Sequence, residues 1–126
     1  MSRELTEGFR SRVLTDHERE LTSWLLARGG GEGEALLSQV KGARVVGRCA
    51  CGCASLDLAV EGRASPVEGE QERVSPEFFW NDESGALCSV HVCARNGTLA
   101  RVETWSAGGA ATPASLPSIR VLRPRP

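Results

Sequence analysis

Residues 85–106 read GALCSVHVCARNGTLARVETWS, and this stretch decides the fold. Asn96-Gly97 is the preferred pair for a tight primed turn, because both central residues of such a turn need positive φ. Apolar and β-branched residues flank the pair on both sides, so the stretch predicts a β-hairpin. A two-residue turn sets three cross-strand pairs: Ala94 with Leu99, Cys93 with Ala100, and His91 with Val102.

Two further features extend this hairpin into a sheet. Residues 87–94 are apolar on both faces, which predicts a central strand. Residues 44–61 form a second predicted hairpin, because ARVVGRC and ASLDLAV are β-rich runs that flank Cys51-Gly52. In the second run Leu56, Leu58 and Val60 alternate with polar or small residues, as in a strand buried on one face.

Helical signals are confined to the N-terminal third. In LTDHERELTSWLLARGGG (14–31), Thr15 and Glu18 form a capping box and the apolar residues share one stripe. Gly29–Gly31 predict its C-terminal end. A shorter helix is expected in GEALLSQVKGA (33–43), and residues 1–12 are expected to be a frayed or short helical lead-in.

The remaining segments are less regular. GRASPVEGEQERVSP (62–76) predicts an exposed loop, EFFWND (77–82) a short strand, and residues 107–126 a Gly/Ala/Pro-rich tail whose SIRVLR (118–123) could add an edge strand. Helices followed by strands indicate an α+β fold. We expect a single domain over residues 1–126, with two N-terminal helices packed on an antiparallel sheet of four to five strands.

Composition is that of an ordinary soluble globular chain, with 126 residues, 40% hydrophobic and 25% charged. No apolar run approaches the roughly 20 residues that cross a bilayer, and the N-terminus lacks a signal-peptide pattern. We therefore expect a cytoplasmic protein with no membrane partner. Five cysteines without a signal sequence favour thiols or a metal over a disulfide framework.

The cysteine-rich stretch RCACGCASLDLAV (48–60) is the main candidate site. Cys49, Cys51 and Cys53 lie at the expected hairpin tip, and Cys93 or His91 could complete a tetrahedral zinc site. The spacing differs from zinc knuckles, which usually separate paired cysteines by two residues. Two alternatives stay open: buried thiols that act as small hydrophobes, and a redox or disulfide role.

Catalysis and nucleic-acid binding have weaker signals. A thiol-dependent enzyme could use Cys93 with His91, but positions i and i+2 of a strand are about 6.5 Å apart. No third catalytic residue is marked by the sequence, so we expect a non-catalytic protein. Arginines cluster only in the tail, and a net charge of −1 does not favour nucleic acid.

The acidic segment 61–83 offers a second candidate surface. It carries seven acidic residues against two arginines, next to Phe78, Phe79 and Trp80. Such a surface can attract a partner protein with a basic surface and offer it aromatic anchors. The residues expected to bind the partner are Glu68, Glu70, Glu72, Glu77, Trp80 and Asp82.

Residues 14–26 and 77–109 together resemble a group of small bacterial α+β proteins built around a domain of unknown function. The shared outline is a helix, a glycine-containing hairpin, an acidic-aromatic stretch (here Glu77, Trp80 and Asp82) and a hairpin that ends in Trp105. Some small proteins of this kind look like immunity proteins encoded beside toxins. We therefore expect a non-catalytic binding module of immunity or inhibitor type that uses the acidic surface of residues 61–83. The alternative, which rests on the cysteine-rich tip, is a small zinc-binding protein, and a weaker alternative is a thiol-dependent enzyme.

Overall fold

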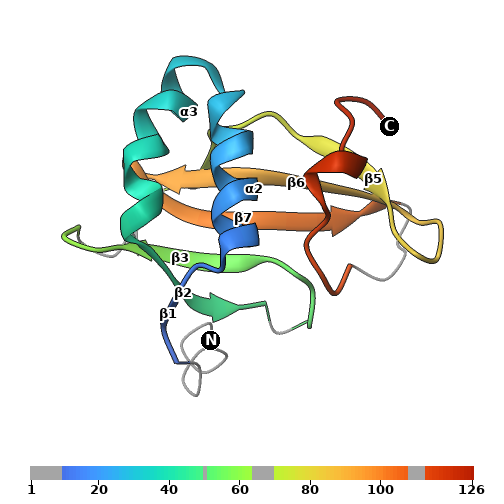
Figure 1. Ribbon diagram of the computed structural model, residues 1–126, viewed down its shortest axis with the longest axis horizontal. Helices are drawn as coiled ribbons and strands as arrows, with labels where there is room; N and C mark the ends of the chain where they lie inside the picture. The colour runs from blue at the N-terminus through green and yellow to red at the C-terminus, as the bar shows by residue number, and fades with distance from the viewer. Residues whose placement is uncertain (1–9, 50, 64–69, 108–112) are drawn as a thin grey trace.

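The structure is a computed structural model in which residues 10–49, 51–63, 70–107 and 113–126 are described. These residues form one antiparallel sheet with two α-helices across one of its faces (Figure 1). The elements in chain order are β1 (Arg12–Val13), α2 (Asp16–Ala27), α3 (Gly30–Leu36), η1 (Leu37–Gly42), β2 (Ala43–Arg48), β3 (Leu56–Val60), β4 (Glu72–Arg73), β5 (Phe78–Asn81), β6 (Leu87–Arg95), β7 (Thr98–Ser106) and η3 (Ile119–Val121).

The α+β class with N-terminal helices is confirmed. The strand order is β1-β2-β3-β7-β6-β4, and β5 also pairs with β6. The sheet of the described residues has seven strands where the sequence predicted four to five. The difference comes from two-residue strands: β1 begins at the last residue of the expected lead-in 1–12, and β4 lies in the expected loop 62–76.

The β6–β7 hairpin has the predicted turn but a different register. Asn96 and Gly97 have φ of 53° and 75°, as a primed turn requires, and Ala94 pairs with Leu99. A bulge then shifts the ladder by one residue. Cys93 therefore pairs with Arg101, not Ala100, and His91 pairs with Glu103, not Val102.

The β2–β3 hairpin is confirmed, and it joins the first hairpin edge to edge. Leu56 pairs with Val102 and Asp57 with Arg101, so β3 lies beside β7. The predicted alternation holds, since Leu56 and Leu58 are buried on the helix side. The cysteine-rich loop consequently lies at one end of a three-strand arrangement of β2, β3 and β7.

Helix α2 begins as predicted. The Thr15 hydroxyl accepts from the Glu18 backbone N–H, and the Glu18 carboxylate accepts from the Thr15 N–H, which completes the capping box. Arg12 donates two hydrogen bonds to the same carboxylate, at 2.8 and 2.9 Å. The first turn is thereby tied to strand β1.

The second helix starts earlier than predicted, at Gly30, and continues from Leu37 as a 3₁₀ helix. The glycines allow close packing here. A Cβ on Gly33 would lie 2.3 Å from the Leu26 carbonyl oxygen, and one on Gly29 would lie 2.2 Å from that of Val74. The glycine run therefore forms a tight connection between α2 and α3 rather than a simple stop signal.

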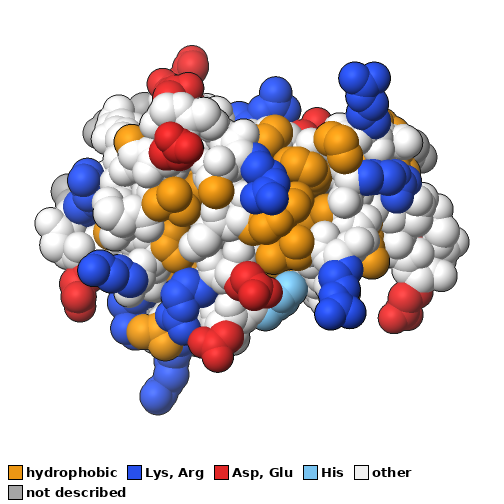
Figure 2. All heavy atoms as spheres, turned by 45° about the horizontal axis from the view of Figure 1, so that its top comes forward, with side chains coloured by type: hydrophobic (Ala, Val, Ile, Leu, Met, Phe, Trp, Pro, Cys, Tyr) orange, Lys and Arg blue, Asp and Glu red, His pale blue; other side chains and the backbone are white. Residues whose placement is uncertain are grey.

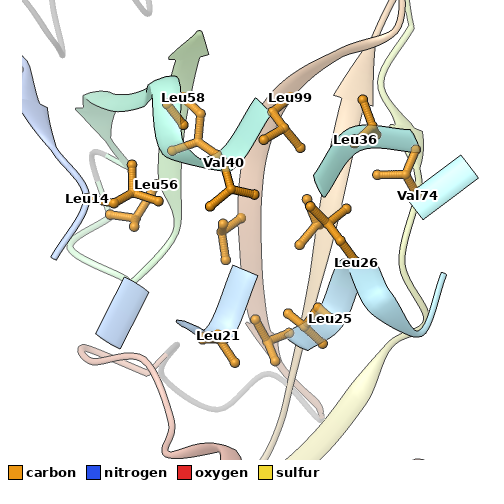
Figure 3. Packing of buried hydrophobic residues seen from close by; sticks show 14 of the residues in the cluster. Leu14, Leu21, Leu25, Leu26, Leu36, Val40, Leu56, Leu58, Val74 and Leu99 are labelled. Carbon is orange, nitrogen blue, oxygen red and sulfur yellow. The ribbon is translucent and has the colours of Figure 1, made fainter. Parts of the chain in front are cut away.

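The core lies between the helices and the sheet (Figure 3). Leucines of α2 meet apolar residues of β2, β3, β6 and β7. The fully buried large side chains include Leu21, Leu25, Leu26, Val45, Leu56, Val90, Val92, Leu99 and Val102. Burying a side chain of this size contributes about 1.5–3 kcal/mol.

The C-terminal segment forms η3 rather than the predicted edge strand. Its Ser118 hydroxyl caps the Arg120 N–H, which starts a 3₁₀ turn. Only an isolated bridge, Phe79 with Arg123, adds to the sheet edge. Leu116, Ile119 and Leu122 pack against the core, and Figure 2 shows apolar side chains gathered between basic ones on the face it presents.

Candidate metal centre

The β2–β3 connection brings three cysteines together. Gly52 has φ +85°, a conformation that L side chains rarely adopt, and its N–H donates to the Cys49 carbonyl at 3.1 Å. The far end of the loop is held by Ala54, whose N–H donates to the Pro113 carbonyl at 2.8 Å. The loop is thus fixed by backbone hydrogen bonds at two points.

The Sγ atoms of Cys49, Cys51 and Cys53 all lie within 4.8 Å of one another. Cys49 and Cys51 are the closest pair, with 3.0 Å between their Sγ atoms, and the Cys53 N–H points at Cys51 Sγ at 3.4 Å. None of the three is in a disulfide bond. Two thiolates on one tetrahedral zinc ion are about 3.8 Å apart, given Zn–S bonds of about 2.3 Å. The three Sγ atoms are therefore within reach of one ion, although the Cys49 and Cys51 thiols, 3.0 Å apart, would have to separate by about 0.8 Å to share it.

Exposure differs across the three thiols. Cys53 is buried at 3% exposure, Cys49 is half-buried and Cys51 is exposed. The hydrogen bond with Cys51 raises the pKa of the Cys49 thiol above its ordinary value. An ion bound here would be held from the protein side by Cys53 and would face solvent beside Cys51.

A guanidinium stands beside this cluster. Arg101 interacts with Cys49 and forms an ion pair with Asp57, its cross-strand neighbour on β3. Burial lowers the Arg101 pKa, but the Asp57 and Glu103 carboxylates and the Cys49 contact together outweigh burial, so the net shift of the pKa is upward. A permanent positive charge beside the cluster favours the thiolate forms that a metal needs.

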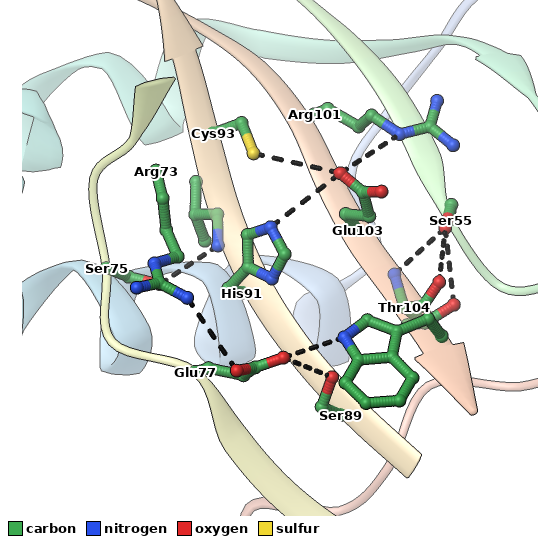
Figure 4. A network of polar contacts seen from close by, with 12 residues as sticks. Ser55, Arg73, Ser75, Glu77, Ser89, His91, Cys93, Arg101, Glu103 and Thr104 are labelled. Atoms are coloured by element: carbon green, nitrogen blue, oxygen red, sulfur yellow. Dashed lines mark hydrogen bonds and ion pairs between the residues drawn. The ribbon is translucent and has the colours of Figure 1, made fainter. Parts of the chain in front are cut away.

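A second donor group lies on the face of the sheet away from the helices (Figure 4). His91 and Cys93 project from β6 toward Glu103 of β7. His91 Nε2 is 3.7 Å from Glu103 Oε1, and Cys93 Sγ is 3.9 Å from the same oxygen. Sequence reasoning missed Glu103, because only the bulge brings it opposite His91.

Both β6 groups favour their neutral forms. Burial raises the pKa of the Cys93 thiol to about 11, and burial lowers the pKa of His91. His91 Nδ1 is buried and has no hydrogen-bond partner among the described residues. A raised thiol pKa is the reverse of what a nucleophilic cysteine needs, so this pair lacks the activation that thiol catalysis requires.

The expected single metal set is therefore divided. Cys49, Cys51 and Cys53 form one group, whereas His91 and Cys93 belong to the other with Glu103. The strand geometry explains this correction. His91 and Cys93 lie on the outer face of β6 and have their cross-strand partners on β7, whereas the hairpin cysteines lie in the loop between β2 and β3.

The expected partner-binding residues are spread over different environments. Trp80 is only 5% exposed and lies in the core, so its assignment as a surface anchor is wrong. Asp82 closes a turn by accepting from the Ser84 and Ala86 N–H groups. Glu70 and Glu72 are exposed, and Glu68 lies outside the described residues.

Glu77 makes an unexpected contact on the outer face. Its Oε2 accepts hydrogen bonds from the Trp105 indole N–H and the Ser89 hydroxyl, both at 2.7 Å. Trp105 is 37% exposed, so it is the indole that this acidic region presents at the surface. The period-2 pattern of β7 places Trp105 on the same face as Glu103.

No family model, curated protein or solved structure matches this chain. Over the part of the chain that the structure describes, no helix has the length and apolar character needed to span a bilayer.

Proposed function

We propose that this protein binds a thiophilic metal ion, with zinc as the preferred ion, at the tip of the β2–β3 hairpin. The observation that carries the proposal is the convergence of the Cys49, Cys51 and Cys53 Sγ atoms within 4.8 Å. Thiolates are the strongest protein ligands for such ions. Three of them, from one short loop, are preorganised by the backbone hydrogen bonds of Gly52 and Ala54.

Charge supports the same assignment. Three thiolates around one Zn²⁺ carry a net charge of −1, and the Arg101 guanidinium beside Cys49, although it is also paired with Asp57, lowers the electrostatic cost of that charge. A three-cysteine site leaves one coordination position for water or an external ligand, on the side of the exposed Cys51. An ion in such a site is exchangeable, which suits a metal sensor or carrier better than a purely structural role.

The proposal is tested by competition for Zn²⁺ against a chromogenic chelator. Cys51→Ser should weaken Zn²⁺ binding at least tenfold while the unfolding transition stays in place, because Cys51 is exposed. The matched control is Cys88→Ala, which removes a buried thiol from β6 outside both donor groups. Equal affinity in the wild type and Cys51→Ser would refute the site.

A second candidate is a protein-binding role on the outer face, supported by the exposed Trp105 beside Glu77. An exposed indole next to acidic side chains is a combination that basic partner surfaces recognise. Trp105→Ala should abolish capture of such a partner, whereas Val121→Ala should not, although Val121 is 50% exposed. Loss of capture in both variants would indicate nonspecific hydrophobic binding.

A further inference from the structure

We infer that His91, Cys93 and Glu103 form a second, independent site for a divalent cation of the zinc class. The site lies on the outer face of the β6–β7 hairpin (Figure 4). It shares no ligand with the hairpin cysteines and does not rest on the function proposed above.

The geometry is close to that of a coordinated ion. Tetrahedral zinc, with bonds of about 2.0–2.3 Å, places a nitrogen and an oxygen ligand about 3.3 Å apart and a sulfur and an oxygen about 3.5 Å apart. The corresponding distances here are 3.7 Å for His91–Glu103 and 3.9 Å for Cys93–Glu103. Small side-chain rotations close this difference.

The donors also sit on a rigid support. His91 and Cys93 lie on the same face of β6, which pairs with β7 on one side and with β4 and β5 on the other. Glu103 of β7 is the direct cross-strand partner of His91. Cys93 is buried and the His91 side chain is 13% exposed, so the site is shielded on one side and open on the other. Sites on paired strands hold their ligands more precisely than sites on loops.

Local charge favours a divalent cation in spite of two nearby arginines. Arg101 is paired most closely with Asp57, and Arg73 is paired with Glu77 at 3.7 Å. Within each pair the two charges cancel, which leaves the negative charge of Glu103, whose Oε1 also lies 4.0 Å from Arg101 Nε. A bound cation would therefore compete with Arg101 for this carboxylate. Together with a cysteine thiolate, Glu103 supplies two negative charges, the number that one divalent cation neutralises.

The surroundings of His91 predict which of the two sites binds Zn²⁺ more tightly. Metal-bound histidines almost always donate their second ring N–H to an acceptor, which strengthens binding. Among the described residues His91 Nδ1 has no such partner. We therefore expect weaker binding here than at the three-cysteine loop, with the hairpin filling first.

The two histidines of the chain provide a direct readout. In the Cys49→Ala/Cys51→Ala variant, which lacks the hairpin site, Zn²⁺ is titrated while the histidine ring signals are followed by NMR. His91 should shift and saturate at one equivalent. His17, exposed in the first turn of α2, should stay in place. Equal responses of both rings, or none at one equivalent, would overturn the site.

Variants in the same background separate the site from general charge effects. Glu103→Gln should weaken the His91 response at least tenfold. Glu72→Gln, which removes an exposed carboxylate on β4, should leave it unchanged. Equal weakening in both would show a nonspecific electrostatic effect and refute the proposal.

A stoichiometry measurement covers the case in which the double-cysteine variant does not fold. The wild-type chain should bind two Zn²⁺, and Cys93→Ser should bind one. A wild-type chain that binds only one ion, with Cys93→Ser unchanged, would contradict the second site and leave the hairpin site intact. A wild-type chain that binds none would contradict both.

Discussion

Asp57 and Arg101 are cross-strand neighbours that form an ion pair on the outer face of the sheet. The pair links β3, which leads out of the cysteine loop, to β7. The Arg101 side chain is only 19% exposed. Asp57→Asn should therefore lower the free energy of unfolding by about 1–3 kcal/mol, because it removes the closest charged partner of a half-buried guanidinium and leaves only Glu103, at 4.0 Å. Urea unfolding measures this loss.

An exposed pair on α2 is the control for that measurement. Arg19 and Asp16 are 2.8 Å apart, but the Asp16 side chain is fully exposed. Asp16→Asn should change the free energy of unfolding by less than about 1 kcal/mol. If Asp57→Asn lowered the free energy of unfolding no more than Asp16→Asn does, the Asp57–Arg101 pair would contribute no more to stability than an exposed ion pair.

Acid should weaken the start of α2. The Arg12 hydrogen bonds hold the pKa of Glu18 below its ordinary value of 4.5, against the upward effect of burial. A carboxylate with a lowered folded pKa stabilises above the unfolded value, and this contribution is lost as pH falls through the folded pKa. The stability difference between wild type and Glu18→Gln should be largest above pH 5 and should shrink on acidification. A constant difference down to pH 3 would contradict the ion pair.

Two glycines of α3 should respond in opposite directions to alanine. A Cβ at Gly33 would lie 2.3 Å from the Leu26 carbonyl oxygen, so Gly33→Ala should cost about 1–3 kcal/mol of unfolding free energy. A Cβ at Gly31 meets nothing within 4 Å, so Gly31→Ala should stabilise by about 0.5–1 kcal/mol. Thermal unfolding of both variants tests the packing of α2 on α3. Equal effects would refute it.

These elements also show which parts of the structure could be predicted from the sequence. Two short-range signals specify their local structure directly. The capping box of Thr15 and Glu18 starts a helix, and the positive φ angles of Asn96 and Gly97 form a hairpin turn. Together with the β-rich runs on either side of Cys51-Gly52, they predict the helix, both hairpins and the α+β class. The three hairpin cysteines could be placed together for the same reason, since the loop that holds them is local.

The second donor group could not be found this way. A bulge beside Cys93 moves Glu103 opposite His91, and the sequence carries no clear mark of that extra residue. Trp80, which was predicted to lie at the surface, is likewise buried, because burial depends on which strand face meets the helices. The strand register, and the sheet face on which each side chain lies, are set by tertiary packing, which a local pattern does not encode.

In the chelator-treated, metal-free protein, the thiols should react in an order set by exposure. Cys51 is exposed and should be alkylated first. Cys93 should react slowly, because burial raises its pKa to about 11 and leaves little thiolate at neutral pH. Peptide mapping of a timed alkylation series gives the order. Modification of Cys93 before Cys51 would contradict the arrangement of β6 and the hairpin loop.

The most direct test of the metal-binding proposal is native mass spectrometry of the chain purified without added metal, before and after treatment with a chelator. Free thiols are counted in the same samples. Without added metal we expect a mass excess of one zinc, held by the tighter hairpin site, that the chelator removes, together with Cys49 and Cys51 becoming reactive only after chelation. A metal-free mass that persists after incubation with equimolar Zn²⁺, with Cys51 reactive throughout, would contradict the proposal.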